Sequence, residues 1–249
     1  MIFTIALREL RSLFLSPLAW VILAVVQLIL AFLFLSHVDL FLSVQSRLLG
    51  MEGAGGLTDF VVAPLLGNTA IVLLLVVPLI TMRLVAEERR NRTLSLLFSA
   101  PVSMTEIILG KYLGVVLFLL VVIGMVVLMP LSLLTGGGLD LGMFASGVLG
   151  LTLLLAGFAA VGLFMSTLSQ YPTIAGITTF GVLFLFWVLD WSGEGLASKE
   201  VLAYLSLLNH YEPFLRGVFD SADAVYYLLF ITVFLVLSVR RLDADRLGG

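Results

Sequence analysis

Six long runs of apolar residues limit what this chain can fold into more than any other feature of its sequence. A helix needs about 20 apolar residues to cross a hydrocarbon layer roughly 30 Å thick. Because backbone groups in lipid must be hydrogen-bonded within their own segment, each run should be helical. The sequence therefore predicts an all-α, polytopic membrane protein with six transmembrane helices, at about Pro17–Leu35, Val61–Met82, Ile107–Leu134, Leu141–Leu168, Thr173–Leu189 and Val225–Val239.

The composition argues against a soluble fold. Hydrophobic residues make up 61% of the 249-residue chain and charged residues only 12%, whereas a soluble domain is about half apolar and a quarter charged. The third and fourth runs exceed one membrane thickness, and either helix tilt or the breaks that Pro130 and Gly157 permit would absorb the excess. We therefore expect a single transmembrane domain that comprises residues 1–249.

Residues 1–15, before the first run, are expected to form an interfacial helix of their own. Arg8 and Arg11 share its polar side, where they can meet anionic headgroups. The other side is apolar at helical spacing, with Phe3, Ala6, Leu7, Leu10, Leu13 and Phe14. A plain inward extension of the first membrane helix is the alternative. A signal peptide is disfavoured because the first run exceeds the roughly 7–15 residues of such a segment and no small-residue cleavage pattern follows it.

Basic residues in the loops set the expected orientation, since short cytoplasmic loops are enriched in Lys and Arg. With the N-terminus inside, ten of the 13 Lys and Arg residues fall on the inner side and three on the outer side. We therefore expect both termini in the cytoplasm and the chain in a bacterial inner membrane. The inner residues are Arg8, Arg11, Arg83, Arg89, Arg90, Arg92, Lys111, Arg240, Arg241 and Arg246, and the outer ones are Arg47, Lys199 and Arg216.

Residues 190–224 form an outer segment that is too long for a tight turn and too apolar for a free loop. The prediction is a short outer-surface or re-entrant helix pair, broken near Pro213. Tyr and Trp side chains around it favour the membrane interface, so the segment is either an aromatic belt or part of a gate. The candidate residues for an outer gate are His210, Tyr211, Glu212 and Pro213.

The first inner loop, a cytoplasmic segment at residues 83–106, carries charges of both signs. Because orientation needs only basic residues, the acidic ones indicate a surface that meets another protein. We expect a short amphipathic helix from about Val85 to Phe98, in which Glu88 and Arg92 pair at positions i and i+4. Pro101 prevents its continuation. A solvated loop that happens to carry charge is the alternative.

A capping box closes this loop. Ser103 and Glu106 have the S-x-x-E spacing that satisfies the free amides at a helix start, so the third membrane helix should begin here. A helix, a fixed turn and a new helix would be able to transmit force from outside the membrane into the bundle.

Three separate regions of the chain resemble one known family. In the inner loop, the order EER, TL, LL, APVS and LGK is similar to the coupling region of ABC-2 type transporter permeases. The branch that it resembles includes gliding-motility and nitrous-oxide-reductase maturation permeases. The N-terminal ALRELRSLFLSP and the later HYEPFLRGVFDSADAVYYL are similar to the same branch. The resemblance thus covers nearly the whole chain.

The resemblance implies a six-helix permease that pairs with a second copy or a related permease and docks on two cytoplasmic ABC ATPase subunits. Charged residues of the loop would make polar contacts with the ATPase, and Leu94, Leu97 and Phe98 the apolar ones. The chain departs from the family pattern at Arg92, where a glycine is frequent, and at Ser95, where an acidic residue is frequent. The expected ATPase-coupling interface comprises Glu87, Glu88, Arg89, Arg92, Thr93, Leu94, Leu97, Phe98 and Pro101.

Several catalytic and binding motifs are missing from the sequence. It contains no G-x-x-x-x-G-K-[ST] phosphate loop and no H-E-x-x-H zinc motif. We therefore expect no directly bound cofactor, with ATP and Mg held only by the partner ATPase. The apolar runs contain essentially no ionisable groups, which disfavours a proton-coupled transporter. Their neutral polar residues are expected to form interhelical hydrogen bonds, at Gln27, Asn68, Thr81, Ser132, Thr152, Thr178 and Thr179.

Small residues recur at a spacing that allows close helix packing. The three cases are Gly110-x-x-x-Gly114, Ser146-x-x-x-Gly150 and Ala156-x-x-x-Ala160. They fit either contacts within the chain or the seam of a dimer.

These features lead to one functional hypothesis and its alternatives. The chain is expected to be the permease subunit of an ABC transporter, not itself an enzyme, that exports or extracts an unidentified substrate or does mechanical work on a partner. An accessory membrane or periplasmic protein and the lipid bilayer are further expected partners, and nucleic acid is not. An ATP-independent channel or scaffold that binds a cytoplasmic protein is the alternative. A membrane-embedded enzyme is disfavoured by the absence of cysteine and of paired histidines.

Overall fold

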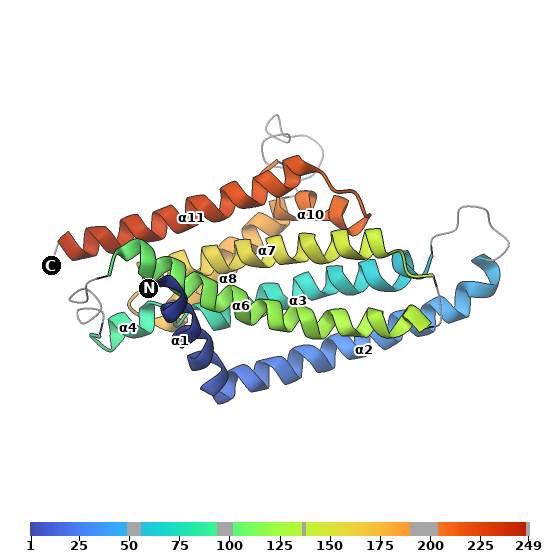
Figure 1. The fold of residues 1–249 in the computed structure, drawn as a ribbon, viewed down its shortest axis with the longest axis horizontal. Helices are drawn as coiled ribbons and strands as arrows, with labels where there is room; N and C mark the ends of the chain where they lie inside the picture. The colour runs from blue at the N-terminus through green and yellow to red at the C-terminus, as the bar shows by residue number, and fades with distance from the viewer. Residues whose placement is uncertain (49–55, 94–101, 136–137, 190–203, 248–249) are drawn as a thin grey trace.

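A computed structural model describes residues 1–48, 56–93, 102–135, 138–189 and 204–247 (Figure 1). These residues form helices and contain no strand, as the sequence predicts. A π-helical turn at Thr58–Val62 leads into α3, and a 3₁₀ turn at Ser132–Thr135 follows α6. The α-helices are α1 (Ile2–Leu15), α2 (Pro17–Leu48), α3 (Ala63–Thr81), α4 (Ala86–Arg90), α6 (Met104–Leu131), α7 (Leu141–Leu168), α8 (Pro172–Val188), α10 (Leu207–Leu215) and α11 (Ser221–Leu247).

Five helices in the described ranges are long and apolar enough to cross a membrane, which confirms a polytopic membrane protein. The fifth predicted run forms α8, whose 17 residues lie at the lower end of the span length of about 17–25 residues. Helix α2 continues past Leu35 to Leu48, and the side chains of Ser36 and His37 bond to carbonyls of their own helix at 2.9 and 2.6 Å. The five long segments are Pro17–Gln45, Thr58–Arg90, Met104–Leu134, Leu141–Leu168 and Ser221–Arg246.

Helix α7 lies at the centre of the bundle, where it packs against α3, α6, α8, α10 and α11. The long helices run along the long axis of the molecule in Figure 1, and both termini lie at the same end. Helix α7 runs unbroken through Gly157, and Pro130 lies in the last turn of α6. The breaks that these two residues permit therefore do not occur inside the spans.

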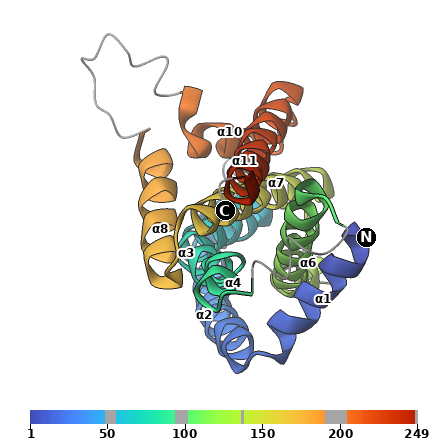
Figure 2. The ribbon, with the colours of Figure 1, turned by 90° about the vertical axis from the view of Figure 1, so that its left-hand side faces the viewer.

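Helix α1 is separate from α2, because the extended backbone of Ser16 (φ −79°, ψ 125°) divides them. The predicted alternative, a plain extension of the first membrane helix, is therefore wrong. Figure 2 shows α1 lying beside α6. Two glycines allow the close approach: a Cβ at Gly110 would lie 2.6 Å from Ile5 Cβ, and one at Gly114 would lie 2.8 Å from Glu9 Cβ. This small-residue pair is thus a contact within the chain.

The exposed surface of α1 has two parts. Phe3 and Leu7 are exposed apolar side chains, at 78% and 62%, and Arg8 and Arg11 are exposed on the polar part. A helix with this arrangement suits the boundary between acyl chains and headgroups.

The neutral polar side chains of the spans mostly do not bridge helices. Thr81, Thr152 and Thr179 each donate to the carbonyl four residues earlier, at 2.6–2.9 Å. The prediction of interhelical bonds is wrong for them because that carbonyl lies within reach of a helical threonine hydroxyl. Gln27 follows the prediction, since its Nε2 donates to the Met125 carbonyl of α6 at 3.3 Å. Ser132 and Thr178 also bond to nearby carbonyls.

Helix α10 covers part of the predicted outer segment, of which residues 190–203 lie outside the described ranges. The predicted break near Pro213 is confirmed, because α10 ends at Leu215, two residues after Pro213, and α11 begins at Ser221. Gly217, two residues after the helix end, has a left-handed backbone with φ +78°. There the Gly217 and Val218 amides donate to the carbonyls of Phe214 and Pro213, at 3.2 and 2.9 Å, as in a Schellman motif.

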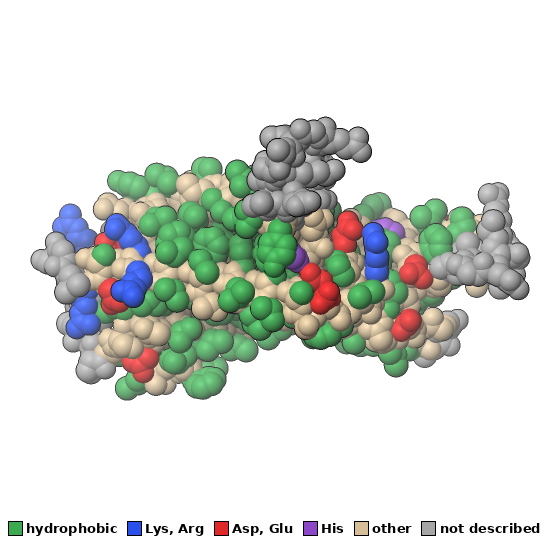
Figure 3. Space-filling view, turned by 90° about the horizontal axis from the view of Figure 1, so that it is seen from above, with side chains coloured by type: hydrophobic (Ala, Val, Ile, Leu, Met, Phe, Trp, Pro, Cys, Tyr) green, Lys and Arg blue, Asp and Glu red, His purple; other side chains and the backbone are tan. Residues whose placement is uncertain are grey.

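Charge is distributed unevenly along the bundle. In the space-filling view of Figure 3, most Lys and Arg side chains gather at one end, and hydrophobic side chains cover the middle. This is the end that carries both termini and α4, and it is called the basic end below.

Candidate functional site

The short helix α4 is held at the basic end by the terminus of α7. Between α3 and α4 the chain turns at residues 82–85. The Ser166 hydroxyl of α7 accepts the Val85 and Ala86 amides at 3.0 and 3.1 Å and donates to the Met82 carbonyl at 3.1 Å. One buried side chain therefore satisfies the backbone of the turn and the first amides of α4.

Helix α4 is much shorter than the predicted helix from Val85 to Phe98, since it ends at Arg90. The Arg92 and Thr93 amides donate to the carbonyls of Arg89 and Glu88, at 3.2 and 3.0 Å. This Schellman motif needs a left-handed residue, usually glycine, and Arg92 occupies it with φ 56°. The predicted helical pairing of Glu88 with Arg92 is wrong because Arg92 lies beyond the helix end.

Three ionisable side chains from α1, α4 and α6 meet beneath this helix. The Lys111 ammonium group donates to Glu88 Oε1 at 2.7 Å and to Glu9 Oε1 at 3.2 Å. Lys111 is only 1% exposed, so its charge depends on these two carboxylates. Arg8 lies at the rim, 3.8 Å from Glu88 and 3.9 Å from Glu9.

A second group of charges joins α4 to α7 and α11. The Arg89 guanidinium pairs with Asp245 of α11 and donates to the Thr167 carbonyl of α7 at 2.8 Å. Arg241 lies 3.4 Å from the same Asp245 carboxylate. Among the described residues, Glu88 Oε2 and Arg89 Nε are buried without a hydrogen-bond partner. Each of these two charged residues thus keeps one unused polar atom.

The predicted interface residues that the structure describes divide into two groups. Glu88 and Arg89 turn into the molecule, at 22% and 14% exposure. Glu87, Arg92 and Thr93 are exposed. Leu94, Leu97, Phe98 and Pro101 lie outside the described residues.

The predicted capping box is confirmed at the start of α6. The Glu106 amide donates to the Ser103 hydroxyl at 3.2 Å, and the Ser103 amide donates to Glu106 Oε2 at 3.1 Å. Since these bonds are local, spacing alone was enough to predict them.

Sequence reasoning missed Lys111, Glu9 and Asp245 as parts of this site. Lys111 lies inside the third apolar run, where an ionisable residue signals a buried partner. Glu9 is the only acidic residue among residues 1–15. These two signals together could have suggested the pair, whereas Asp245 follows no pattern that points to Arg89.

The opposite end contains a second polar cluster, between α10 and α11. His210 Nδ1 lies 2.6 Å from Asp223 Oδ1, and Nε2 lies 2.9 Å from the Tyr204 carbonyl. Both ring nitrogens thus lie within hydrogen-bond distance of an oxygen atom. The ring stacks on Tyr226 at a centroid distance of 3.8 Å. The cluster fastens α10 to the start of α11.

The four candidate gate residues take different positions. His210 belongs to this cluster, and Tyr211 is buried, with its hydroxyl donating to the Leu66 carbonyl of α3 at 3.1 Å. Burial raises the pKa of the Tyr211 phenol, so it stays protonated. Glu212 pairs with Arg216 at 3.2 Å on the surface, and Pro213 lies within α10.

A cavity of about 700 Å³ adjoins α10 at this end. Tyr211 and Glu212 line it, together with Asn68 of α3 and Trp187 of α8. Its walls are mainly apolar, and its volume lies within the roughly 300–1,000 Å³ of small-molecule sites. As for metals, the described residues contain no group of three or more His, Asp or Glu side chains placed to hold an ion.

Comparison with known proteins identifies a family match over more than half of the chain. The sequence model described as ABC-2 family transporter protein matches residues 41–189. The matched region runs from the second half of α2 to the end of α8 and so includes α4. A search of curated proteins finds no match.

Proposed function

The chain belongs to the ABC-2 transporter family as a multi-pass permease domain, and from this premise we propose that it is the membrane subunit of a transporter powered by a separate ATPase. Family membership implies partner ATPase subunits in general. The specific proposal is that α4 receives the force of ATP-driven closure and passes it to the bundle.

The observation that carries this proposal is the set of contacts that α4 makes. Glu88 pairs with Lys111 of α6, which also pairs with Glu9 of α1, and Arg89 binds α7 and α11. Removing one partner of a buried ion pair costs roughly 3–5 kcal/mol. A displacement of α4 would therefore move the attached helices rather than break away from them.

The unused atoms at Glu88 and Arg89 allow these contacts to change. Arg8 lies 3.8 Å from Glu88, beyond normal hydrogen-bond distance. A small shift of α4 could bring Arg8 onto the free oxygen of Glu88. We propose that this exchange of partners distinguishes two states of the basic end.

We propose that the exposed side of α4 and its following turn meet the ATPase. Glu87, Arg90, Arg92 and Thr93 are the exposed side chains there. Glu88 and Arg89, expected at the same interface, act instead behind it as transmitting residues. The apolar contacts of Leu94, Leu97 and Phe98 and the turn at Pro101 remain part of the proposal.

Co-purification tests this docking proposal. The chain would be co-expressed with an ABC ATPase encoded beside it and purified in mild detergent. We expect the two proteins to elute in about equal numbers and to hydrolyse ATP. Arg90→Glu should weaken co-elution by about tenfold, because the reversed charge would replace an attraction to the ATPase surface by a repulsion. The matched control is Arg216→Glu, which reverses an exposed charge at the opposite end.

A permease that elutes alone would overturn the proposal. The chain would then be an ATP-independent channel or scaffold that binds another cytoplasmic protein.

A separate experiment tests whether movement of α4 is passed to the helix bundle. Asp245→Asn weakens the pair with Arg89 and leaves the exposed side of α4 intact. We expect ATPase binding to be unchanged, while ATP no longer alters the labelling rate of a cysteine introduced at Val218, which is 57% exposed. An ATP-dependent change that survives Asp245→Asn would exclude Arg89 as a transmitting residue.

Further parts of the proposal follow from the resemblance and the loop charges. We propose six spans with α8 as the fifth, a permease dimer or a pair with a related permease, and both termini in the cytoplasm of a bacterium. ATP and Mg would bind to the partner ATPase. The motifs around residues 210–228 support the gliding-motility and nitrous-oxide-reductase maturation branch, in which an accessory protein would face the outer segment.

A gate at α10 is the remaining proposal for the outer segment. Tyr211 and Glu212 border the 700 Å³ cavity, and the His210 cluster holds α10 against α11. Movement of α10 would open or close this cavity.

A further inference from the structure

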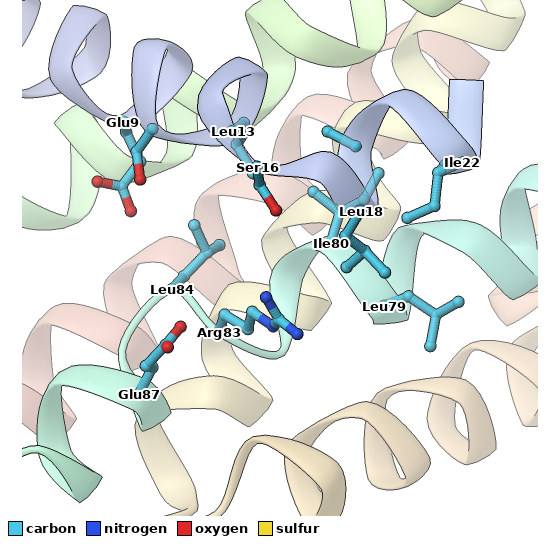
Figure 4. A pocket seen from close by; sticks show the side chains of 12 residues that line it. Glu9, Leu13, Ser16, Leu18, Ile22, Leu79, Ile80, Arg83, Leu84 and Glu87 are labelled. Carbon is cyan, nitrogen blue, oxygen red and sulfur yellow. The ribbon is translucent and has the colours of Figure 1, made fainter. Parts of the chain in front are cut away.

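A cavity at the basic end lies apart from the contacts of α4 with α7 and α11. It is enclosed by α1, the start of α2, the end of α3 and the turn into α4, and its volume is about 240 Å³. Figure 4 shows Arg83 and Glu87 projecting into it from one side and Glu9 from the other. The cavity exists because Ser16 separates α1 from α2 at an angle.

The cavity holds two opposite charges that do not pair. Arg83 and Glu87 are both exposed, and neither side chain forms an ion pair or a hydrogen bond with another described residue. They are four residues apart, a spacing that would pair them on a continuous helix. The turn at residues 82–85 interrupts the helix between them, so a cation and an anion border one cavity and each keeps its hydrogen-bonding capacity.

The remaining lining has a polar part and an apolar part. Ser12 and Ser16 contribute hydroxyl groups, and Glu9 contributes a carboxylate that is shared with Lys111. Leu18 and Leu79 form an apolar rim that is 38% and 46% exposed. In a membrane protein, exposed leucines on spanning helices face acyl chains. The cavity therefore joins a charged recess to the lipid-facing surface.

We propose that this cavity binds the headgroup of phosphatidylethanolamine. The Arg83 guanidinium would bind the phosphate, because a planar guanidinium can donate two parallel hydrogen bonds to phosphate oxygens. Glu87 and the hydroxyl of Ser12 would accept hydrogen bonds from the ammonium group. The acyl chains would run along Leu18 and Leu79. The placement of this lipid in the inner leaflet rests on the proposed topology, whereas the binding itself does not.

Size and charge both select this headgroup. The volume of about 240 Å³ is below the roughly 300–1,000 Å³ of sites that enclose a whole small molecule, so only a headgroup enters. A purely anionic headgroup would place its phosphate near Glu87 and offer that carboxylate no cation. A trimethylammonium group has no N–H to donate to Glu87 or Ser12.

Native mass spectrometry of the delipidated full-length chain tests the proposal. The chain would be titrated in mild detergent, without ATPase, with phosphatidylethanolamine, phosphatidylglycerol and phosphatidylcholine of identical acyl chains. We expect one ethanolamine lipid per chain to bind about tenfold more tightly than either of the others, as one charge-assisted hydrogen bond allows. Equal binding of all three lipids, or tighter binding of phosphatidylglycerol, would overturn it.

Two variants separate the roles of the charges. Glu87→Gln should remove the preference for ethanolamine and leave phosphatidylglycerol binding unchanged or stronger. Arg83→Gln should lower the affinity for all three lipids by about tenfold. The control, Arg246→Gln, removes an exposed cation from the end of α11, away from the cavity, and should change nothing. Retention of the ethanolamine preference in Glu87→Gln would refute the proposal.

The outcome is independent of the ATPase. Lipid selectivity without co-elution of an ATPase would support the site and refute the coupling function. Co-elution of an ATPase without lipid selectivity would support the coupling function and refute the lipid site.

Discussion

At the residue scale, Lys111 determines how the charges of the basic end balance. Its ammonium group is 1% exposed and lies between the carboxylates of Glu9 and Glu88. A buried cation is tolerated only when paired, and the same holds for the acids that it pairs with. The three residues therefore depend on one another.

Lys111→Met should destabilise the protein because it leaves two carboxylates facing each other. We expect a loss of roughly 3–5 kcal/mol in the free energy of unfolding, measured as a lower midpoint of thermal unfolding in detergent. The matched control is Lys111→Met combined with Glu9→Gln and Glu88→Gln, which should regain most of the loss. An unchanged midpoint in the single variant would show that the cluster contributes little.

Arg92 provides a second test at this scale, because its φ of 56° lies in the left-handed region. A side chain costs roughly 1–2 kcal/mol there, and glycine avoids this cost. Arg92→Gly should therefore be more stable than Arg92→Ala by about 1 kcal/mol, measured by thermal unfolding. The alanine variant controls for loss of the Arg92 side chain, and a less stable glycine variant would contradict the left-handed turn.

At the scale of elements, the contact of α1 with α6 joins the amphipathic helix to the bundle. Ile5 and Glu9 of α1 lie over Gly110 and Gly114 of α6. Because the same contact brings Glu9 to Lys111, packing and electrostatics at this junction are coupled.

Gly110→Val should detach α1, since even a Cβ would lie 2.6 Å from Ile5 Cβ. We expect faster trypsin cleavage at the exposed Arg8 and Arg11, together with a lower thermal midpoint. Gly124→Val is the control on the same helix, because a Cβ at Gly124 meets nothing within 4 Å. Equal cleavage in the two variants would mean that α1 does not depend on this contact.

At the scale of the whole molecule, the two ends of the bundle differ in charge. Most basic side chains lie at the end with both termini and α4, as Figure 3 shows. By the positive-inside rule, we propose that this end faces the cytoplasm. Helix α8 must cross for both termini to lie there.

Single cysteines can test this arrangement because the chain has no native cysteine. We expect a membrane-impermeant maleimide added to spheroplasts to label cysteines at Leu42 and Val218, which are 60% and 57% exposed. Cysteines at Asn91 and Tyr171 should react only after permeabilisation. Labelling of positions 171 and 218 from the same side would show that α8 does not cross.

The sequence by itself determined the helical membrane class, the positions of the long spans and the capping box at Ser103 and Glu106. Apolar runs and capping spacings act over one helix or one turn, so they can be read without the fold. The end of α4 could be predicted in part, since Arg92 occupies a position where the family frequently has a glycine. The prediction still extended the helix to Phe98, because amphipathic spacing continues past the left-handed residue.

Only the tertiary structure decided which charges meet. Lys111 and Glu9 are separated by 102 positions, and Arg89 and Asp245 by 156. The fold alone shows that Glu88 and Arg89 turn inward while Glu87 stays exposed, and that Arg83 and Glu87 share a cavity without pairing. The physical reason is that local patterns specify each helix, whereas ion pairs and cavities depend on how separate helices pack in three dimensions.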